Sequence, residues 1–226
     1  MQNCIFGLLM LQVHSFTFNP LEENTYVLFD ETKKAAIVDP GCYEKAEQNE
    51  LSRFITEQGL TVTHLINTHC HIDHVLGNEF VKRTFRAPFY IHPLEEPVLR
   101  AATAYAAMYG FPAYQPAQPD QWLAPGTDII IGQTPMSVLF LPGHSPGHIG
   151  LYQKEQKLLI SGDVLFYRSV GRTDLPGGDW ETLAHSIRQR LFLLPDEVVV
   201  YPGHGPTTTV GDEKHYNPFV GNAAMA

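Results

Sequence analysis

Residues 68–74 read THCHIDH and constrain this chain more than any other segment. They place His69, His71, Asp73 and His74 close together, directly after an apolar run that predicts a strand. His69 and His71 are two positions apart, so their side chains face the same way in an extended backbone. One metal ion cannot easily take all four groups at this spacing, whereas two neighbouring ions can. Because imidazole and carboxylate ligands suit zinc, iron or manganese, the segment predicts a site for two metal ions at the end of a strand.

Three later residues have the context expected of further ligands. His144 lies in LPGHSPGH, Asp163 in ISGD and His204 in YPGHG. Each follows an apolar, strand-like run, and glycine or proline beside it lets the backbone turn tightly and aim one side chain inward. Functional sites assemble from loops at one edge of a rigid scaffold, so we expect these three residues to join the cluster.

Composition narrows the kind of protein that carries this cluster. The chain has 226 residues, of which 44% are hydrophobic and 17% charged, and this excludes a disordered chain. No linker divides it, so we expect a single domain over residues 1–226. The formal net charge of −9 argues against nucleic acid as the main ligand.

Cysteine usage and the N-terminal segment bear on where the protein works. Three cysteines cannot form a disulfide framework, so a reducing, cytoplasmic compartment is expected. The apolar run at residues 4–11 lacks the cationic flank and cleavage site of a signal peptide and is too short to span a membrane. We interpret it as a strand or the start of one, and we expect no membrane partner.

Hydrophobic periodicity predicts the order of the secondary-structure elements. Strands are expected at 10–18, 24–29, 35–38, 62–67, 88–91, 129–131, 136–141, 149–152, 157–161 and 198–201, and helices at 44–58, 75–85, 94–109 and 180–194. The helix at 180–194 should bury Leu183, Ile187, Leu191 and Leu194. A proline-rich loop at 111–125 is a candidate lid or pocket wall. Strands followed by a helix occur twice, which favours two sheets with helices outside them.

The seven candidate ligands, in this order and spacing, resemble the metallo-β-lactamase fold superfamily, and the likeness covers essentially the whole chain. VDPG at 38–41 adds to it. Within that superfamily the chain is most similar to glyoxalase II and its short single-domain relatives, through GRTDLPGGD at 171–179, GHGPTTTVG at 203–211 and NPF at 217–219. The resemblance implies an α+β fold, an αββα four-layer sandwich with a dinuclear site on its upper edge.

Specific roles are implied by the same resemblance. One metal would take His69, His71 and His144, the other would take Asp73, His74 and His204, and Asp163 would bridge both. The cofactors would be two divalent ions, zinc first, with iron or manganese as alternatives. A bridging hydroxide would attack the carbonyl carbon of the substrate, and Asp73 would orient it or accept its proton. Asp39 is a candidate for fixing a ligand imidazole or the cluster loop. His148, four residues after His144, is interpreted as another surface or core histidine, with a supporting role as the alternative.

The chain also departs from two-domain glyoxalase II. We expect it to lack the C-terminal helical extension that binds much of glutathione. Where glyoxalase II has a lysine and a tyrosine, this chain has Arg172 and Asp174. Arg172 keeps a cation that can bind a carboxylate of the substrate, although a structural ion pair would explain it equally well. The departures weaken the expectation of glutathione more than that of thioester hydrolysis.

Other chemistry-bearing residues are given plainer interpretations. The remaining histidines are expected on the surface or in the core: His14, His64, His92, His185 and His215. Cys70 is interpreted as a packing residue. The alternative interpretation is a redox-sensitive thiol beside the metal ions. Aromatic residues of the segment around the proline-rich loop are expected to pack between helix and loop, or in part to line a substrate cleft: Tyr105, Tyr109, Phe111 and Tyr114.

These observations lead to a first hypothesis and several alternatives. The first is a dinuclear metallohydrolase that cleaves a small thioester, such as a hydroxyacyl-glutathione. The alternatives are a persulfide dioxygenase with a single iron, a lactone, β-lactam or other ester hydrolase, an RNA phosphodiesterase, and a metal-binding protein without catalysis. The complete set of seven ligands argues against a mononuclear or a non-catalytic protein, and the acidic charge argues against RNA. The expected partner is a small molecule, and the oligomeric state is left open.

Overall fold

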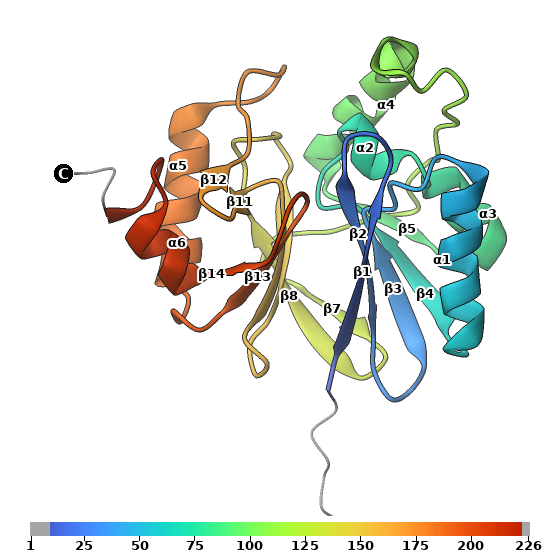
Figure 1. The fold of residues 1–226 in the computed structure, drawn as a ribbon, viewed down its shortest axis with the longest axis horizontal. Coiled ribbons are helices and arrows are strands. Elements are labelled where there is room, and N and C mark those ends of the chain that lie inside the picture. Colours follow the sequence, from blue (N-terminus) through green and yellow to red (C-terminus); the bar gives the residue numbers. More distant parts are fainter. Residues whose placement is uncertain (1–9, 223–226) are drawn as a thin grey trace, which may run out of the picture.

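Two six-stranded β-sheets lie face to face, with helices on the outer face of each, in a computed structural model that describes residues 10–222 (Figure 1). The first sheet has the order β1 (Gln12–Phe18), β2 (Glu23–Phe29), β3 (Lys34–Val38), β4 (Thr61–Ile66), β5 (Phe89–Ile91) and β6 (Gln121–Trp122). The second has the order β14 (Thr208–Thr209), β13 (Val199–Pro202), β10 (Leu158–Gly162), β9 (Ile149–Gln153), β8 (Thr134–Phe140) and β7 (Asp128–Ile131). The predicted four-layer sandwich is confirmed.

Helices form the two outer layers. The first sheet is covered by α1 (Lys45–Glu57), α3 (Asn78–Phe85) and α4 (Glu96–Tyr105), and α2 (Ile72–Val75) lies at its upper edge (Figure 1). The second sheet is covered by α5 (Trp180–Gln189) and α6 (Val210–Tyr216). A small hairpin, β11 (Leu165–Phe166) with β12 (Ser169–Val170), follows β10. No helix within residues 10–222 combines the length and the apolar character needed to cross a membrane.

Three apolar cores hold the four layers together, and the strands serve two of them at once. On β2, Val27 and Phe29 face the core under α1 and α3, whereas Tyr26 and Leu28 face the core between the sheets. This alternation follows from the two-residue period of a strand. A third core, which includes Leu183, joins α5 to the second sheet. Strands buried on both faces are almost continuously apolar, and this explains why sequence patterning located them.

Parallel pairing brings the candidate ligands to one edge of the sandwich. β3, β4 and β5 run parallel to one another, as do β10 and β13. Parallel strands end at the same edge of a sheet, and in α/β proteins ligands bind outside those carboxyl ends. The segment 67–74 follows β4, Asp163 follows β10, and His204 follows β13.

The helix expected at 75–85 is wrong as one unit, because the chain turns at Gly77. α2 ends at Val75 and α3 begins at Asn78. The Gly77 N–H donates to the carbonyl oxygen of Pro40 at 2.7 Å instead of continuing a helical ladder. A Cβ at Gly77 would lie 2.5 Å from Cys42 Sγ, so only glycine allows this approach.

The other differences concern helix ends and short elements. In place of the helix expected at 94–109, α4 is flanked by 3₁₀ turns at Pro93–Glu95 and Ala106–Tyr109. The helix expected at 180–194 ends at Gln189, and a 3₁₀ turn at Leu191–Leu193 follows it. Leu183, Ile187 and Leu191 are buried as expected, but Leu194 is only partly buried because it lies beyond that turn. β6 lies within the expected loop at 111–125, and the periodicity did not indicate α6, β11, β12 or β14. Most of the run at residues 4–11 lies outside the described residues.

Candidate metal centre

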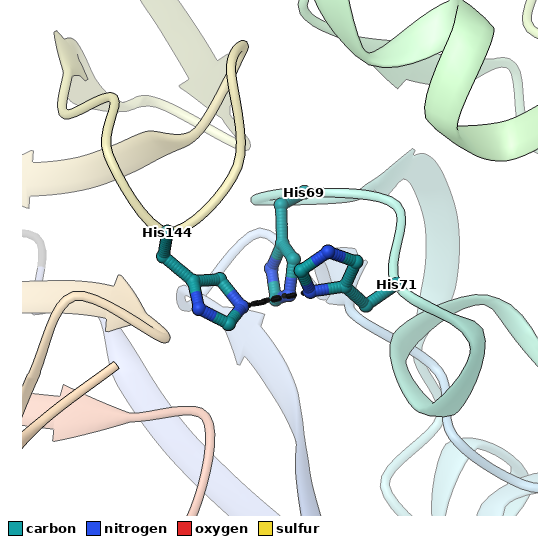
Figure 2. A group of neighbouring side chains, drawn as sticks. All are labelled: His69, His71 and His144. Carbon is teal, nitrogen blue, oxygen red and sulfur yellow. Dashed lines mark hydrogen bonds between the residues drawn. The ribbon is translucent and has the colours of Figure 1, made fainter. Parts of the chain in front are cut away.

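Three histidines from two different sheets converge at the upper edge of the sandwich. His69 and His71 follow β4, and His144 lies in the loop between β8 and β9. Their ring nitrogens point toward one another (Figure 2). His144 Nε2 lies 2.8 Å from His71 Nδ1 and 3.2 Å from His69 Nε2. The structure thus brings together the three residues predicted for the first metal.

A second group lies beside the first and contains the residues predicted for the second metal. Asp73 and His74 are on α2, and His204 follows β13. Asp73 Oδ2 lies 3.1 Å from His204 Nε2 and 3.6 Å from His74 Nε2. His74 is fully buried, whereas the side chain of His204 is 27% exposed. Solvent therefore reaches the centre from the side of His204.

Asp163 lies between the two groups and contacts both. Its Oδ1 lies 3.4 Å from His74 Nε2. Its Oδ2 lies 3.5 Å from His144 Nε2 and 3.5 Å from His204 Nε2. One carboxylate thus faces both groups, which is the arrangement that a bridging ligand requires.

The geometry of these atoms fits metal ions better than a hydrogen-bonded polar cluster. His74 Nε2 and Asp163 Oδ1 are buried, yet neither has a hydrogen-bond partner among the described residues. Tetrahedral ligands about 2.0–2.1 Å from a zinc ion lie about 3.3 Å from one another. The contacts of Asp73 and Asp163 with the histidines, at 3.1–3.6 Å, bracket that value, whereas His71 Nδ1 and His144 Nε2 lie closer together, at 2.8 Å.

The electrostatics of the centre agree with cation binding. Burial lowers the pKa of His71 to about 3 and that of His69 well below its ordinary value, so both rings are neutral, the form that binds metal. Burial alone would raise the pKa of Asp163, but His74 and His144 outweigh it and lower the pKa, so the carboxylate is anionic. Burial alone would also lower the pKa of His74, but Asp73 and Asp163 outweigh it and raise that pKa well above its ordinary value. The centre therefore combines neutral His69 and His71 with carboxylates that attract positive charge to His74.

Asp39 and His148 contact the segments that carry the candidate ligands. Asp39 accepts hydrogen bonds from the Thr68 N–H at 2.7 Å and the Thr68 hydroxyl at 2.6 Å, and its Oδ2 lies 3.3 Å from His74 Nδ1. His148 Nε2 accepts the N–H of Asp163 at 3.0 Å, and its ring stacks on that of His69. Contacts of this kind orient ligands and tune metal affinity.

Arg172 meets the centre through its backbone. Its carbonyl oxygen accepts a hydrogen bond from His144 Nδ1 at 2.7 Å, which leaves His144 Nε2 free to bind metal. Its guanidinium forms a two-pronged ion pair with Asp174, both contacts being 2.7 Å, and both side chains are more than half exposed. The backbone contact was not foreseen, and binding of substrate by the guanidinium stays a prediction.

Two buried glutamates beside the centre escaped the sequence analysis. Glu23 Oε1 lies 3.9 Å from His74 Nδ1, and Glu95 accepts hydrogen bonds from the segments that carry His69, His71 and His144. Neither glutamate lies in a recognisable motif. Only the tertiary contacts distinguish them from the surface glutamates that most chains carry.

The remaining histidines and aromatic residues have other surroundings. His14 stacks on Phe54, and His92 stacks on Phe140. Cys70 and Phe111 belong to the core that joins the first sheet to its helices. Tyr105 is partly buried against the same core, and burial, with Tyr109 and Asp73 nearby, raises its pKa to about 12.

Comparison with known proteins adds independent findings. A family model described as "Metallo-beta-lactamase superfamily" matches residues 19–204. A curated relative from Haemophilus influenzae, named hydroxyacylglutathione hydrolase GloC, is 37% identical over 201 residues, covering 88% of this chain and 93% of the relative. The solved structure of BLEG-1 B3 metallo-beta-lactamase has a TM-score of 0.84 and 37% identity, over 92% of this chain and 99% of that one. TTHA1623, solved in a di-iron-bound form, has a TM-score of 0.81 and 38% identity, over 92% of this chain and 100% of that one.

Proposed function

The chain belongs to the metallo-β-lactamase superfamily, and from that premise we propose that it is a metal-dependent hydrolase that cleaves a small thioester at a dinuclear site. The observation that carries the proposal is the position of Asp163. Its two oxygens lie within 3.5 Å of histidine nitrogens from both groups. The relative named hydroxyacylglutathione hydrolase supports the thioester as substrate.

The metal ions would be held by the residues that the structure brings together. His69, His71 and His144 would hold the first, Asp73, His74 and His204 the second, and Asp163 would contact both. When bound, two divalent ions would polarise the carbonyl group of the substrate and make water a stronger acid. Zinc is proposed first, with iron supported by the di-iron form of TTHA1623.

The residues of the chain would supply the proton transfer and the binding. Asp73 is the carboxylate next to His204, on the side that solvent reaches, and would accept the proton that water loses. A thiol of pKa about 8.5 can leave as a thiolate, so the leaving group needs no strong general acid. Arg172, whose backbone fixes His144, would bind an anionic group of the substrate.

The test is thiol release from a hydroxyacyl-glutathione thioester by protein of known metal content. Turnover should stop after metal removal by a chelator and return when Zn²⁺ is restored. Asp163→Ala should lose dinuclear loading and activity. Asp128→Ala removes an exposed carboxylate whose side-chain partner among residues 10–222 is the Ser137 hydroxyl on a neighbouring strand, and this variant should keep both dinuclear loading and activity. Full activity of Asp163→Ala with two metals bound would refute the bridging assignment.

A β-lactam is the second candidate substrate, because the structure of a B3 metallo-beta-lactamase matches this chain over 92% of its length. Parallel assays with a thioester, the matching oxygen ester, a lactone and a β-lactam would rank these substrates by kcat/KM. A single bound iron with oxygen consumption on a persulfide would replace the hydrolase proposal by the dioxygenase alternative.

A further inference from the structure

Glu95 forms a buried bridge between two loops of the metal centre. It ends a 3₁₀ turn, Pro93–Glu95, and its side chain is fully buried. Oε2 accepts the N–H of Cys70 at 2.8 Å, and Oε1 accepts the N–H of Gly147 at 2.7 Å and the hydroxyl of Ser145 at 2.5 Å. One carboxylate thus binds three donors from two separate loops.

The donors are immediate neighbours of histidines in the centre. Cys70 lies between His69 and His71, and Ser145 directly follows His144. The two loops belong to different sheets, since one follows β4 and the other joins β8 to β9. The distance between His71 and His144 therefore depends on contacts that cross from one loop to the other.

The rings of His144 and His148 contact the first loop directly at the centre, but few other hydrogen bonds among the described residues join the two loops. Besides Glu95, the Ile149 N–H donates to the Thr68 carbonyl oxygen at 2.9 Å. Within the described residues, no lysine or arginine forms an ion pair with Glu95, so its negative charge is met by three neutral donors. A carboxylate suits this place because both of its oxygens accept hydrogen bonds, whereas an amide would turn its own NH₂ donor toward one of the three donors.

We propose that Glu95 is a positioning residue that sets the spacing of His69 and His71 against His144 and so fixes the affinity of the first metal site. The inference rests on the proposed metal ligands but not on the identity of the substrate. Supporting contacts around metal ligands are worth 10–100-fold in metal affinity. Glu95 acts at a distance from the reacting atoms, through the loops that it joins.

Glu95→Gln tests this inference because the amide has the same shape and one fewer acceptor. In one orientation its NH₂ group would face the N–H of Cys70, and in the other it would face the N–H of Gly147. One bridge is lost in either case. We expect one of the two Zn²⁺ dissociation constants, measured by competition with a chromophoric chelator, to rise about 10–100-fold while the other changes by less than about threefold.

Glu213→Gln is the matched control. Glu213 lies on α6 and is also fully buried; its carboxylate accepts the Arg168 N–H and the side-chain N–H of Asn217. Unlike Glu95 it also forms an ion pair with the Arg168 guanidinium, at 2.9 Å. The Glu213→Gln variant should have a lower melting temperature in the metal-free state, with both Zn²⁺ dissociation constants unchanged. Ser145→Ala removes a single hydrogen-bond donor to Glu95 and should weaken the same Zn²⁺ site by a smaller factor. This variant tests the inference if Glu95→Gln does not fold.

The outcomes separate this inference from the proposed function. Wild-type protein that fails to bind two Zn²⁺ ions would refute the proposed centre itself. Wild-type protein that binds two ions, with Glu95→Gln or Ser145→Ala binding both at unchanged affinity, would refute the role of Glu95 alone. Equal weakening by Glu213→Gln would show that any loss of a buried glutamate has this effect, and it would also refute the role.

Discussion

Gly203→Ala should disable the metal centre while leaving the fold nearly intact. A Cβ built on Gly203 would lie 2.0 Å from Asp163 Oδ1 and 2.8 Å from His74 Cε1, whereas ordinary contact begins at 3.4 Å. The carboxylate would therefore have to withdraw by more than about 1 Å. A displacement of about 1 Å at reacting groups costs about 100-fold in rate. We expect kcat/KM for the proposed thioester hydrolysis to fall at least that far, with the protein holding fewer than two metal ions.

The same contact predicts little loss of folding stability in the metal-free protein. The φ angle of Gly203 lies outside the positive range, so alanine fits its backbone. The atom that must move most is the end of the Asp163 side chain, which can rotate. Alanine also restricts the unfolded chain, which stabilises a protein by about 0.4–1 kcal/mol and offsets part of the contact cost. The free energy of unfolding should stay within about 1 kcal/mol of wild type, measured in urea with a chelator present.

Gly205→Ala provides the opposite pattern two residues away. Nothing lies within 4 Å of its Cβ position, but its φ of +74° is costly for alanine. We expect a loss of about 1–2 kcal/mol in stability, with both metals and most of the activity retained. The reasoning fails if Gly203→Ala keeps two metals and a rate within about twofold of wild type, or if both variants lose metal equally.

Three further predictions follow from other contacts. Burial alone would raise the pKa of Asp30, but the hydroxyl and N–H of Thr32 and the N–H of Gln133 outweigh it, so its pKa is lowered. Asp30→Asn should therefore lower the free energy of unfolding by about 1–3 kcal/mol at pH 7, measured in urea. The difference from wild type should vanish as the pH falls below about 4 and through the folded pKa of Asp30. A difference that stays constant with pH would contradict this reasoning. Metal removal should lower the melting temperature, because each ion at 100 times its Kd adds about 2.7 kcal/mol to the free energy of unfolding. Calorimetry with and without a chelator measures this shift, and an unchanged melting temperature would show that the site holds no metal. Arg172→Ala should raise KM more for an anionic thioester than for a neutral one, and equal changes in steady-state assays would remove its role in binding.

The candidate centre was predictable because its ligands are concentrated in short motifs. His69, His71, Asp73 and His74 lie in one segment, and glycine or proline marks the turns that carry His144, Asp163 and His204. Each turn follows a strand whose apolar run is evident without tertiary information. The convergence of these loops then follows from parallel pairing, which brings strand ends to one edge.

The supporting contacts were not predictable, because they depend on positions that only the folded chain defines. Glu95 is buried by loops that follow strands of two sheets, and its own sequence context does not distinguish it from the partly exposed Glu96 beside it. The backbone carbonyl of Arg172 carries no sequence signal at all, since every residue has one. The break at Gly77 depends on Pro40 and Cys42, which are distant in the sequence.

The division of the ligands between the two sheets has a consequence for how a newly made chain acquires its metals. Residues 69–74 emerge from the ribosome first, but His144 is needed for the first group and His204 for the second. A nascent chain with only its first sheet formed thus lacks one proposed ligand of each group, although Asp39, His69 and His74 could already hold an ion together. Complete loading of the proposed centre would therefore come at the end of synthesis, once both sheets have docked.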